Sequence, residues 1–341
     1  MLAVRTGLMA CLLLAACDGN PLEGGGGEPD PIGPNSSVSS LPGTTNPSAT
    51  RDITRTEEKV TAAGADYGNG FAEGYSYNAA DDTFTVDNLA FDGGNVYTRS
   101  GAVPNLGPAQ VYRASATFED AQTGVQIDQF SYRALYGVST TGRTSFAIVR
   151  TGAYVPYGFG GFIYSRDGGV VLPTGGQANY TGDYAGLRDY NGRGGMDMVT
   201  GDMEMSIDFN DFNPDESDTG NGAGIQGQVT NRRVFDLNGN DITAAVLTEL
   251  NDDKNPDVDL TELPTLVFKV GPGVLDNNGE AEGELDSTIN SNGSPELLED
   301  GKYYAVISGD NADEVAGVIV VTSSVNGVTV RETGGFILYR P

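Results

Sequence analysis

The residue with the clearest chemical role in this sequence is Cys17, the only cysteine outside the first sixteen residues. Residues 14–16 are Leu, Ala and Ala, the branched, small, small order that precedes the modified cysteine of a bacterial lipobox. The apolar run 8–14 is too short to span a bilayer as a helix, so residues 1–16 are predicted to be a lipoprotein signal peptide. Cys17 is the predicted lipidation site, and an ordinary secretory signal that happens to contain a cysteine is the alternative.

Few side chains are left for other covalent or metal chemistry. Cleavage before Cys17 removes Cys11, which excludes a disulfide, thiol catalysis and cysteine-based metal sites in the mature chain. The sequence contains no histidine, which excludes a Ser-His-Asp triad, His-bound zinc and His-ligated haem. A hydrolase that uses carboxylates is one hypothesis, but no spacing marks a catalytic pair among the 47 aspartates and glutamates. We therefore predict a protein that is not an enzyme and has no cofactor.

An acidic run in the second half of the chain has the alternate spacing of a calcium-binding loop. Its oxygen-bearing residues are Asp253, Asn255, Asp257, Asp259 and Glu262. The run lacks the glycine that an EF-hand requires at its sixth position, where Val258 stands, and Pro256 interrupts it. Calcium binding stays an open alternative. We favour a solvated loop here and in the similar runs at 210–221 and 236–241.

Some basic and aromatic residues stand out against the acidic background. The basic ones are Arg188, Arg193, Arg232 and Arg233. Contact with an anion or a partner is one hypothesis for them, and ion pairs with nearby carboxylates are the use we favour. Tyr180 and Tyr184 share a face with Ala178, which fits packing better than proton transfer. The aromatic stretch 154–164 is either a ligand-facing loop or, as we favour, a strand whose rings fill a seam between two regions.

The segment after the cysteine and the overall charge indicate where the protein acts. Residues 17–55 contain almost no large apolar side chains and are predicted to be a disordered tether. Acyl chains on Cys17 would hold the protein at a membrane, and the net charge of −28 repels nucleic acid. We expect a monomeric, lipid-anchored protein of the bacterial cell envelope, at the surface or periplasmic face of the outer membrane. Because Asp18 directly follows the cysteine, anchoring in the inner membrane stays an alternative location.

The rest of the chain is predicted to be all-β. Eight segments after residue 165 have strand character: 176–184, 195–209, 224–235, 265–270, 280–287, 302–308, 315–322 and 328–339. Eight strands close a small barrel whose interior is filled by side chains. A slip in parity between Met198 and Met203 predicts a bulge near Thr200, and Asp241 is the predicted cap of a helix over 242–250.

The predicted domains follow from these segments. Residues 166–341 are predicted to form an eight-stranded antiparallel soluble barrel, because charged residues within its strands argue against lipid contact. Residues 56–165 are predicted to form a smaller, sheet-rich N-terminal region. Its expected strands are 71–77, 83–91, 110–118, 127–138 and 143–151.

Four motifs of this second half resemble the lipoprotein barrel domain of the transferrin-binding protein B family, which factor H-binding protein shares. They are G-x-A-x-Y-x-G-x-Y at 176–184, G-D-x-x-x-x-x-D-F at 201–209, and the segments 309–320 and 331–340. The resemblance covers about half of the chain and implies a handle-like sheet packed on a barrel. It also implies loops that capture host proteins or iron-bearing ligands at the cell surface.

From these observations we predict a lipid-anchored extracytoplasmic binding protein whose barrel and handle loops capture a protein or solute ligand. The resemblance implies that this ligand serves iron acquisition. A structural envelope lipoprotein without a dedicated ligand is the alternative.

Overall fold

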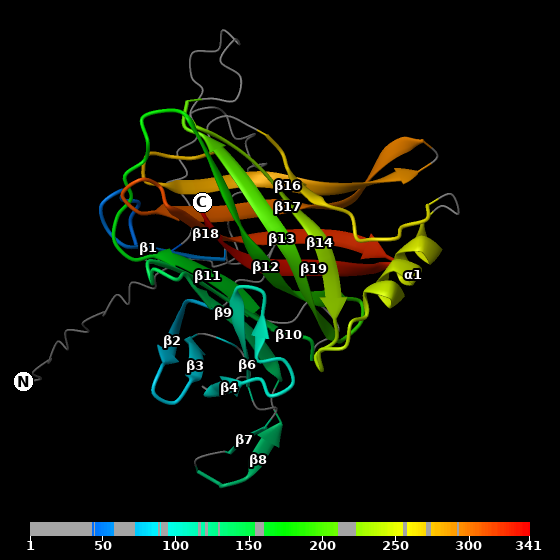
Figure 1. Ribbon diagram of the computed structural model, residues 1–341. Helices are drawn as coiled ribbons and strands as arrows, with labels where there is room; N and C mark the ends of the chain where they lie inside the picture. The colour runs from blue at the N-terminus through cyan, green and yellow to red at the C-terminus, as the bar shows by residue number, and fades with distance from the viewer. Residues whose placement is uncertain are drawn as a thin grey trace, which may run out of the picture.

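The structure is a computed structural model of the chain, in which nineteen strands and one helix are described. The described residues are 43, 45–57, 72–87, 89, 95–114, 117–119, 122–128, 130–153, 160–210, 223–254, 258–270, 274–291 and 293–341. The predicted signal peptide, Cys17 and most of the predicted tether lie outside them. The described strands form a curled sheet followed by a closed barrel (Figure 1).

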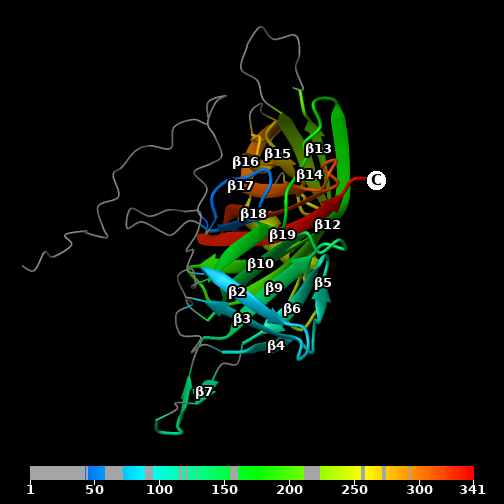
Figure 2. The same ribbon diagram turned by 90° about the vertical axis from the view of Figure 1, so that its left-hand side faces the viewer.

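The curled sheet is built from the first part of the chain in the order β1-β11-β10-β9-β6-β4-β3-β2, with β5 paired to β6. Its strands are β1 (Ile53–Thr56), β2 (Gly74–Asn78), β3 (Thr83–Asp87), β4 (Tyr97–Arg99), β5 (Asn105–Leu106), β6 (Ala109–Arg113), β9 (Tyr132–Val138), β10 (Thr144–Thr151) and β11 (Gly160–Arg166). A separate hairpin, β7 (Thr117–Glu119) and β8 (Gln126–Asp128), projects from it (Figure 2). The hydroxyls of Tyr75 on β2 and Ser145 on β10 lie 2.8 Å apart, so the sheet folds back over itself.

The curled sheet differs from the sequence prediction in three places. Strand β1 begins at Ile53, inside the range predicted as tether. The single strand predicted at 127–138 is wrong: β8 and β9 occupy its two ends and belong to different sheets. The strand predicted at 110–118 is likewise divided between β6 and β7. Alternation of apolar residues marks the face of a strand, but not the point at which the chain leaves its sheet.

The second half of the chain closes into the predicted eight-stranded antiparallel barrel. Its strands are β12 (Gln177–Asn191), β13 (Met196–Asp208), β14 (Gly224–Phe235), β15 (Leu266–Phe268), β16 (Glu280–Ser291), β17 (Ser294–Ser308), β18 (Glu314–Val325) and β19 (Val328–Tyr339). They pair in chain order, and β12 closes the barrel on β19. Each strand overlaps one of the eight predicted segments, and the register shift between Thr200 and Asp202 confirms the predicted bulge.

One helix, α1 (Thr243–Asp253), connects β14 to β15 and lies at one end of the barrel (Figure 1). Its N-cap is Ile242 rather than the predicted Asp241. Asp241 nevertheless accepts a hydrogen bond from the Thr243 backbone N–H at 2.8 Å, so it satisfies one of the first donors of the helix. In the part of the chain that the structure describes, no helix is long and apolar enough to cross a membrane.

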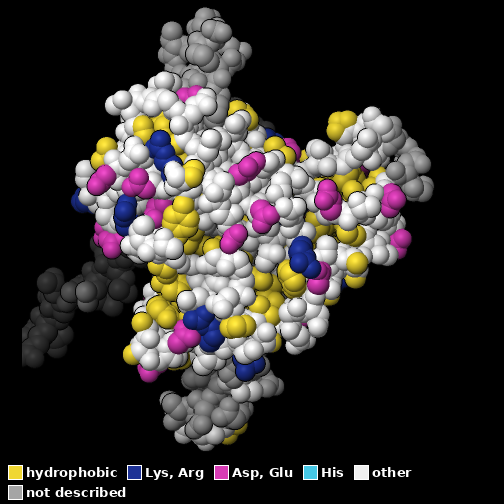
Figure 3. Space-filling view, in the orientation of Figure 1, with side chains coloured by type: hydrophobic (Ala, Val, Ile, Leu, Met, Phe, Trp, Pro, Cys, Tyr) yellow, Lys and Arg dark blue, Asp and Glu magenta, His cyan; other side chains and the backbone are white. Residues whose placement is uncertain are grey.

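The curled sheet packs on the barrel through a buried seam that β10 and β11 form with β12, β18 and β19. Phe146 and Ile148 of β10 meet Leu187 of β12 and Ile337 of β19 there. Apolar side chains follow this junction on the molecular surface (Figure 3). A Cβ on Gly335 would lie 2.3 Å from the ring of Phe146, so the missing side chain lets the two parts approach.

Buried charges also cross the seam. Arg55 of β1 donates from Nε and Nη2 to the two carboxylate oxygens of Glu280 on β16, at 2.6 and 2.7 Å. Glu314 of β18 accepts hydrogen bonds from the hydroxyls of Ser139 and Thr144, both at 3.0 Å. These paired carboxylates fix the orientation of the curled sheet on the barrel, because charge-assisted hydrogen bonds demand a particular geometry.

Candidate functional site

The barrel interior contains a buried ionic array that centres on Arg232 of β14. Its Nη1 and Nη2 donate to the two oxygens of Glu299 on β17 at 2.7 and 2.8 Å, and Nη2 also donates to Glu332 of β19 at 2.8 Å. The hydroxyl of Tyr184 donates to Glu332 at 2.9 Å, and that of Ser287 donates to Glu299 at 2.6 Å. Period-two alternation points all five side chains inward from different strands.

Arg232 and Glu299 keep their charges in spite of burial. Burial alone would lower the pKa of Arg232, but Glu299 and Glu332 raise it above its ordinary value. Burial alone would raise the pKa of Glu299, but Arg232 and Ser287 hold it below its ordinary value. Burial, and then the charge of Glu332, raises the pKa of Tyr184 well above its ordinary value. At neutral pH Arg232 and Glu299 are therefore charged, and the tyrosine is a neutral hydrogen-bond donor.

Within the described ranges, Arg188 of β12 lacks hydrogen-bond partners at Nε and Nη1, as the buried Arg150 also does, whereas Arg232 lacks one at Nε alone. The residue is 6% exposed, and its Nε lies 3.6 Å from Oε2 of Glu332, too far for a hydrogen bond. Among the described residues, the buried Nε and Nη1 of Arg188 have no hydrogen-bond acceptor. An unsatisfied buried charged donor costs free energy that a hydrogen-bond acceptor would restore.

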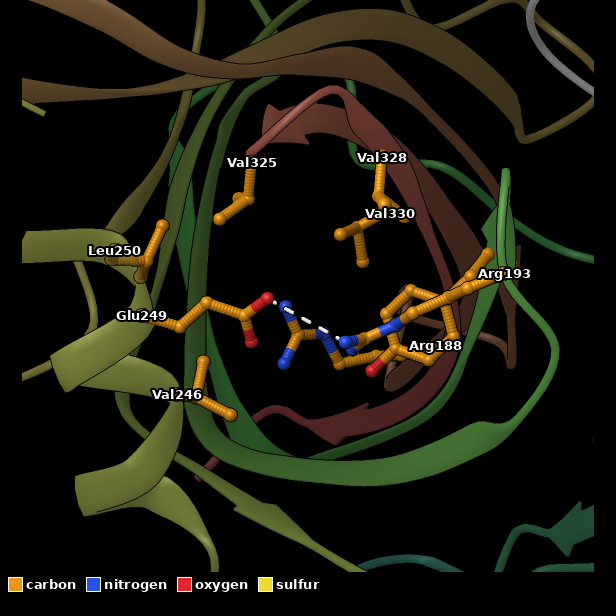
Figure 4. Close-up of a pocket in the computed structure, with 9 residues that line it drawn as sticks. Arg188, Arg193, Val246, Glu249, Leu250, Val325, Val328 and Val330 are labelled. Carbon is orange, nitrogen blue, oxygen red and sulfur yellow. Dashed lines mark hydrogen bonds and ion pairs between the residues drawn. The ribbon is translucent and has the colours of Figure 1, made fainter. Parts of the chain in front are cut away.

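This guanidinium faces a pocket at the α1 end of the barrel, which we name the barrel-mouth pocket (Figure 4). Its cavity volume is about 20 Å³, which is room for about one water molecule unless the rim opens. The lining consists of Arg188, Tyr190, Arg193, Val246, Glu249, Leu250, Val325, Val328 and Val330. These residues come from β12 and the turn after it, from α1, and from the β18–β19 hairpin. The pocket thus has one basic side and one apolar side.

An ion pair spans the rim of the barrel-mouth pocket. Arg193 Nη1 lies 3.5 Å from Glu249 Oε1 of α1, and both side chains are partly exposed (Figure 4). The guanidinium of Arg193 stacks on the ring of Tyr190, 4.1 Å from its centroid. Burial raises the pKa of Tyr190 to about 12, and its hydroxyl donates to Asp197. A partly exposed pair of this kind contributes little to stability, so it can open to admit a solute.

The structure separates the four arginines that the sequence singled out. Arg232 pairs inside the barrel, Arg233 pairs with Asp241 outside it, and Arg193 pairs at the rim. Arg188 pairs with Glu332 at 3.6 Å, so the expected use in ion pairs is confirmed for all four. Arg188 differs in that its Nε and Nη1 lack hydrogen-bond acceptors among the described residues. The tyrosines serve packing as expected: Tyr180 donates to the Ala312 carbonyl at 2.7 Å, and Tyr184 is fully buried.

The candidate calcium loop is only partly described, because residues 255–257 lie outside the described part. Asp253 accepts a hydrogen bond from the Asn326 backbone N–H at 2.7 Å and pairs with Lys254. Asp259 and Glu262 are exposed, and Val258 is buried. Within the described ranges no three acidic, cysteine or histidine side chains are grouped to hold a metal.

The other acidic runs and the aromatic stretch behave as connecting structure where they are described. Asp236 accepts hydrogen bonds from the backbone N–H groups of Asn238 and Asn240, so the 236–241 run is a turn stabilised by its own side chain. Most of the 210–221 run and residues 154–159 lie outside the described part. Phe162 and Tyr164, at the end of the aromatic stretch, are buried in the seam.

Sequence reasoning missed the barrel-mouth pocket, although one signal for it was present. Arg188 has the same parity as Tyr180 and Tyr184, which were assigned to one face, so continuing the alternation would have placed its charge inside the barrel. No comparable signal identified the valines of the β18–β19 hairpin or the helix residues that complete the lining. They meet Arg188 only through the closure of the barrel.

Comparisons with known proteins give distant structural matches alone. No protein-family profile matches the sequence, and no curated protein matches it significantly. A double mutant of transferrin-binding protein B from Haemophilus parasuis Hp5 is 11% identical, with a TM-score of 0.36 over 78% of this chain and 45% of that one. Intact Ap-TbpB, with N and C lobes, is 13% identical, with a TM-score of 0.34 over 76% and 44% of the two chains.

A solved surface lipoprotein is 12% identical, with a TM-score of 0.29 over 59% of this chain and 79% of that one. The chain spans less than half the length of the transferrin-binding protein B structures, and likenesses this distant assign it no ligand. The solved structures to which this chain is similar thus include transferrin-binding protein B, the family that the sequence motifs resemble.

Proposed function

We propose that the protein is a lipid-anchored extracytoplasmic binding protein whose barrel-mouth pocket captures a small solute. The observation that carries the proposal is the buried guanidinium of Arg188, whose Nε and Nη1 lack acceptors and whose side chain lines the pocket. Arg188 pairs with Glu332 only at 3.6 Å, and buried donors without acceptors lower stability. A solute that brings hydrogen-bond acceptors would remove that cost.

The predicted lipobox and the buried ion pairs support the rest of the proposal. Cys17 would carry the lipid, and the polar segment after it would hold the folded body away from the headgroups. The ion pairs of Glu332 with Arg188 and Arg232 hold one wall of the pocket in place. We assign the protein a role in binding rather than in catalysis.

The anchor is tested by Cys17→Ser. We expect this variant to lose incorporation of labelled fatty acid and to leave the membrane fraction, because the thiol that accepts the lipid is gone. Metabolic labelling followed by fractionation measures both effects. A Cys11→Ser variant, altered inside the predicted signal peptide, is the matched control and should stay acylated and membrane-bound. Full membrane retention of Cys17→Ser would contradict the lipid anchor.

Solute capture is tested by filling the pocket. Val328→Phe places a ring among the apolar lining residues, outside the ionic array, and should reduce solute retention by at least about tenfold through steric exclusion. The measurement is equilibrium dialysis of the full-length lipoprotein against small molecules from its growth medium, with mass spectrometry of the retained solutes. The control is Val125→Phe, which changes an exposed residue directly before strand β8. Equal retention by all three proteins would refute capture at the barrel mouth.

A further inference from the structure

A second hollow of the barrel, which we name the outer groove, shares no residue with the barrel-mouth pocket. Its cavity volume is about 520 Å³, within the range of small-molecule sites. It crosses β12, β13 and β14, which run side by side (Figure 1), and ends at β15 and Val270. Six polar side chains line it: Asn179, Thr181, Glu204, Ser206, Gln226 and Gln228.

The strand register arranges these polar side chains in two rows that cross the strands. One row is Asn179, Ser206 and Gln226, and the other is Thr181, Glu204 and Gln228. Neighbouring strands lie about 4.8 Å apart, which is close to the length of one sugar unit in an extended glycan. The rows therefore offer one polar side chain to each of three consecutive sugar units.

Two hydrogen bonds hold these side chains in place without using all of their polar atoms. Ser206 donates to Oδ1 of Asn179 at 2.7 Å, and Gln228 donates to Oε1 of Glu204. The amide nitrogen of Asn179 and the second oxygen of Glu204 remain for a ligand, and Gln226 is exposed. Donors and acceptors thus lie together, as suits hydroxyl groups, which both donate and accept.

The charge of the outer groove disfavours ionic ligands. Glu204 is the only charged residue of its lining, all of which is described. An anion would meet this carboxylate in a protein of net charge −28, and a single carboxylate provides too few oxygens for a metal ion. At one end Val267 and Val270 are 47% and 59% exposed, so the C–H face of a sugar ring can pack there.

We propose that the outer groove binds a linear, neutral glycan that lies across β12, β13 and β14. Its hydroxyl groups hydrogen-bond to the two polar rows, and its terminal ring packs on Val267 and Val270. Gln226 contributes hydrogen bonds to the glycan, whereas the carboxylate of Glu204 rejects charged glycans. This site goes beyond the solute pocket and stands whether or not that pocket is filled.

Saturation-transfer difference NMR of the full-length lipoprotein, in a detergent without a sugar head group, tests this assignment. The probes are cellotriose, glucose and trigalacturonate. Cellotriose should bind at least about tenfold more tightly than glucose, because three units make hydrogen bonds that one unit cannot make. Trigalacturonate has the same number of units with a carboxylate on each ring, and it should not compete with cellotriose.

Two variants separate the roles of hydrogen bonding and charge. Gln226→Met keeps the length of the side chain and should lose at least about fivefold in affinity for cellotriose. Glu204→Gln keeps the shape, so it should bind cellotriose as the parent protein does and also admit trigalacturonate. The control is Asn290→Leu, which removes an exposed amide of β16 outside the groove. Circular dichroism confirms that each variant is folded.

Each contrary outcome is specific. Equal affinity for cellotriose and glucose, or full affinity in Gln226→Met, would show that the two rows are an ordinary solvated strand face and would overturn the proposal. Tighter binding of trigalacturonate than of cellotriose would overturn the neutral class. Val328→Phe, which changes only the barrel-mouth pocket, should leave cellotriose binding unchanged. Loss of binding in that variant would place the glycan in that pocket instead and reject the outer groove.

Discussion

Replacing Arg232 by methionine is expected to lower the free energy of unfolding by about 3–5 kcal/mol, because it leaves two buried carboxylates without their cation. Glu299 and Glu332 both accept hydrogen bonds from this guanidinium within 2.8 Å. Once it is gone, their repulsion is opposed by Arg188, whose nearest contact with Glu332 is 3.6 Å, and by the hydroxyls of Tyr184 and Ser287. Urea denaturation followed by far-ultraviolet circular dichroism measures the change, since the chain has no tryptophan to report it.

The neighbouring arginine provides the matched control. Arg233 points out of the barrel, its side chain is 61% exposed, and it pairs with Asp241. Arg233→Met removes the same group one position further along β14 and should cost less than about 1 kcal/mol. Equal losses for the two variants would show that the inward array does not stabilise the barrel. Adding Glu299→Gln and Glu332→Gln to Arg232→Met should recover part of the loss, because the unpaired charges are then removed.

Replacing Arg55 by methionine is the second change with a large expected effect. Arg55 and Glu280 are almost completely buried and joined by two hydrogen bonds across the seam. The variant leaves the buried Glu280 carboxyl without its ion-pair partner, so we expect a loss of about 3–5 kcal/mol in the free energy of unfolding. It also removes the bond from Arg55 Nη1 to the Thr45 carbonyl. Limited proteolysis should therefore cut the segment around β1 before it cuts the barrel.

The control for this variant is Arg51→Met, an exposed arginine four positions earlier in the same segment. It should leave both the unfolding free energy and the proteolytic pattern within error of the parent protein. Unfolding in one transition, with the barrel and the β1 segment cleaved at the same rate, would contradict a role for Arg55 in attaching this segment to the barrel.

Period-two alternation carried most of the barrel prediction. The strict alternation from Asp202 to Phe209 identified β13, and the change in parity before it located the bulge. The weakest strand, β15, is three residues long where six were expected, because its ladder with β14 and β16 involves only Leu266, Val267 and Phe268. The length over which a strand pairs depends on its neighbouring strands, which the local sequence does not reveal.

The buried ion pairs could not be predicted in the same way. Arg232 and Glu299 are 67 positions apart, and Arg55 and Glu280 are 225 apart. Nothing in the spacing distinguishes Arg232 from Arg233, yet one is buried and the other is exposed. Once the strand is placed, its alternation puts Arg232 inside the barrel and Arg233 outside it. The ion-pair partners of each arginine are set by the closure of the barrel. Likewise, Arg188 was recognised as a conspicuous charge, but only the three-dimensional arrangement shows that it lacks acceptors.

The pairing of β12 with β19 has a consequence for folding. Until β19 is in place, β12 and β18 each present an open edge that can pair with another polypeptide. The incomplete chain is therefore exposed to aggregation for as long as its final hairpin is delayed. A chaperone that binds unpaired strands would protect it, and its release would coincide with the arrival of the last strand.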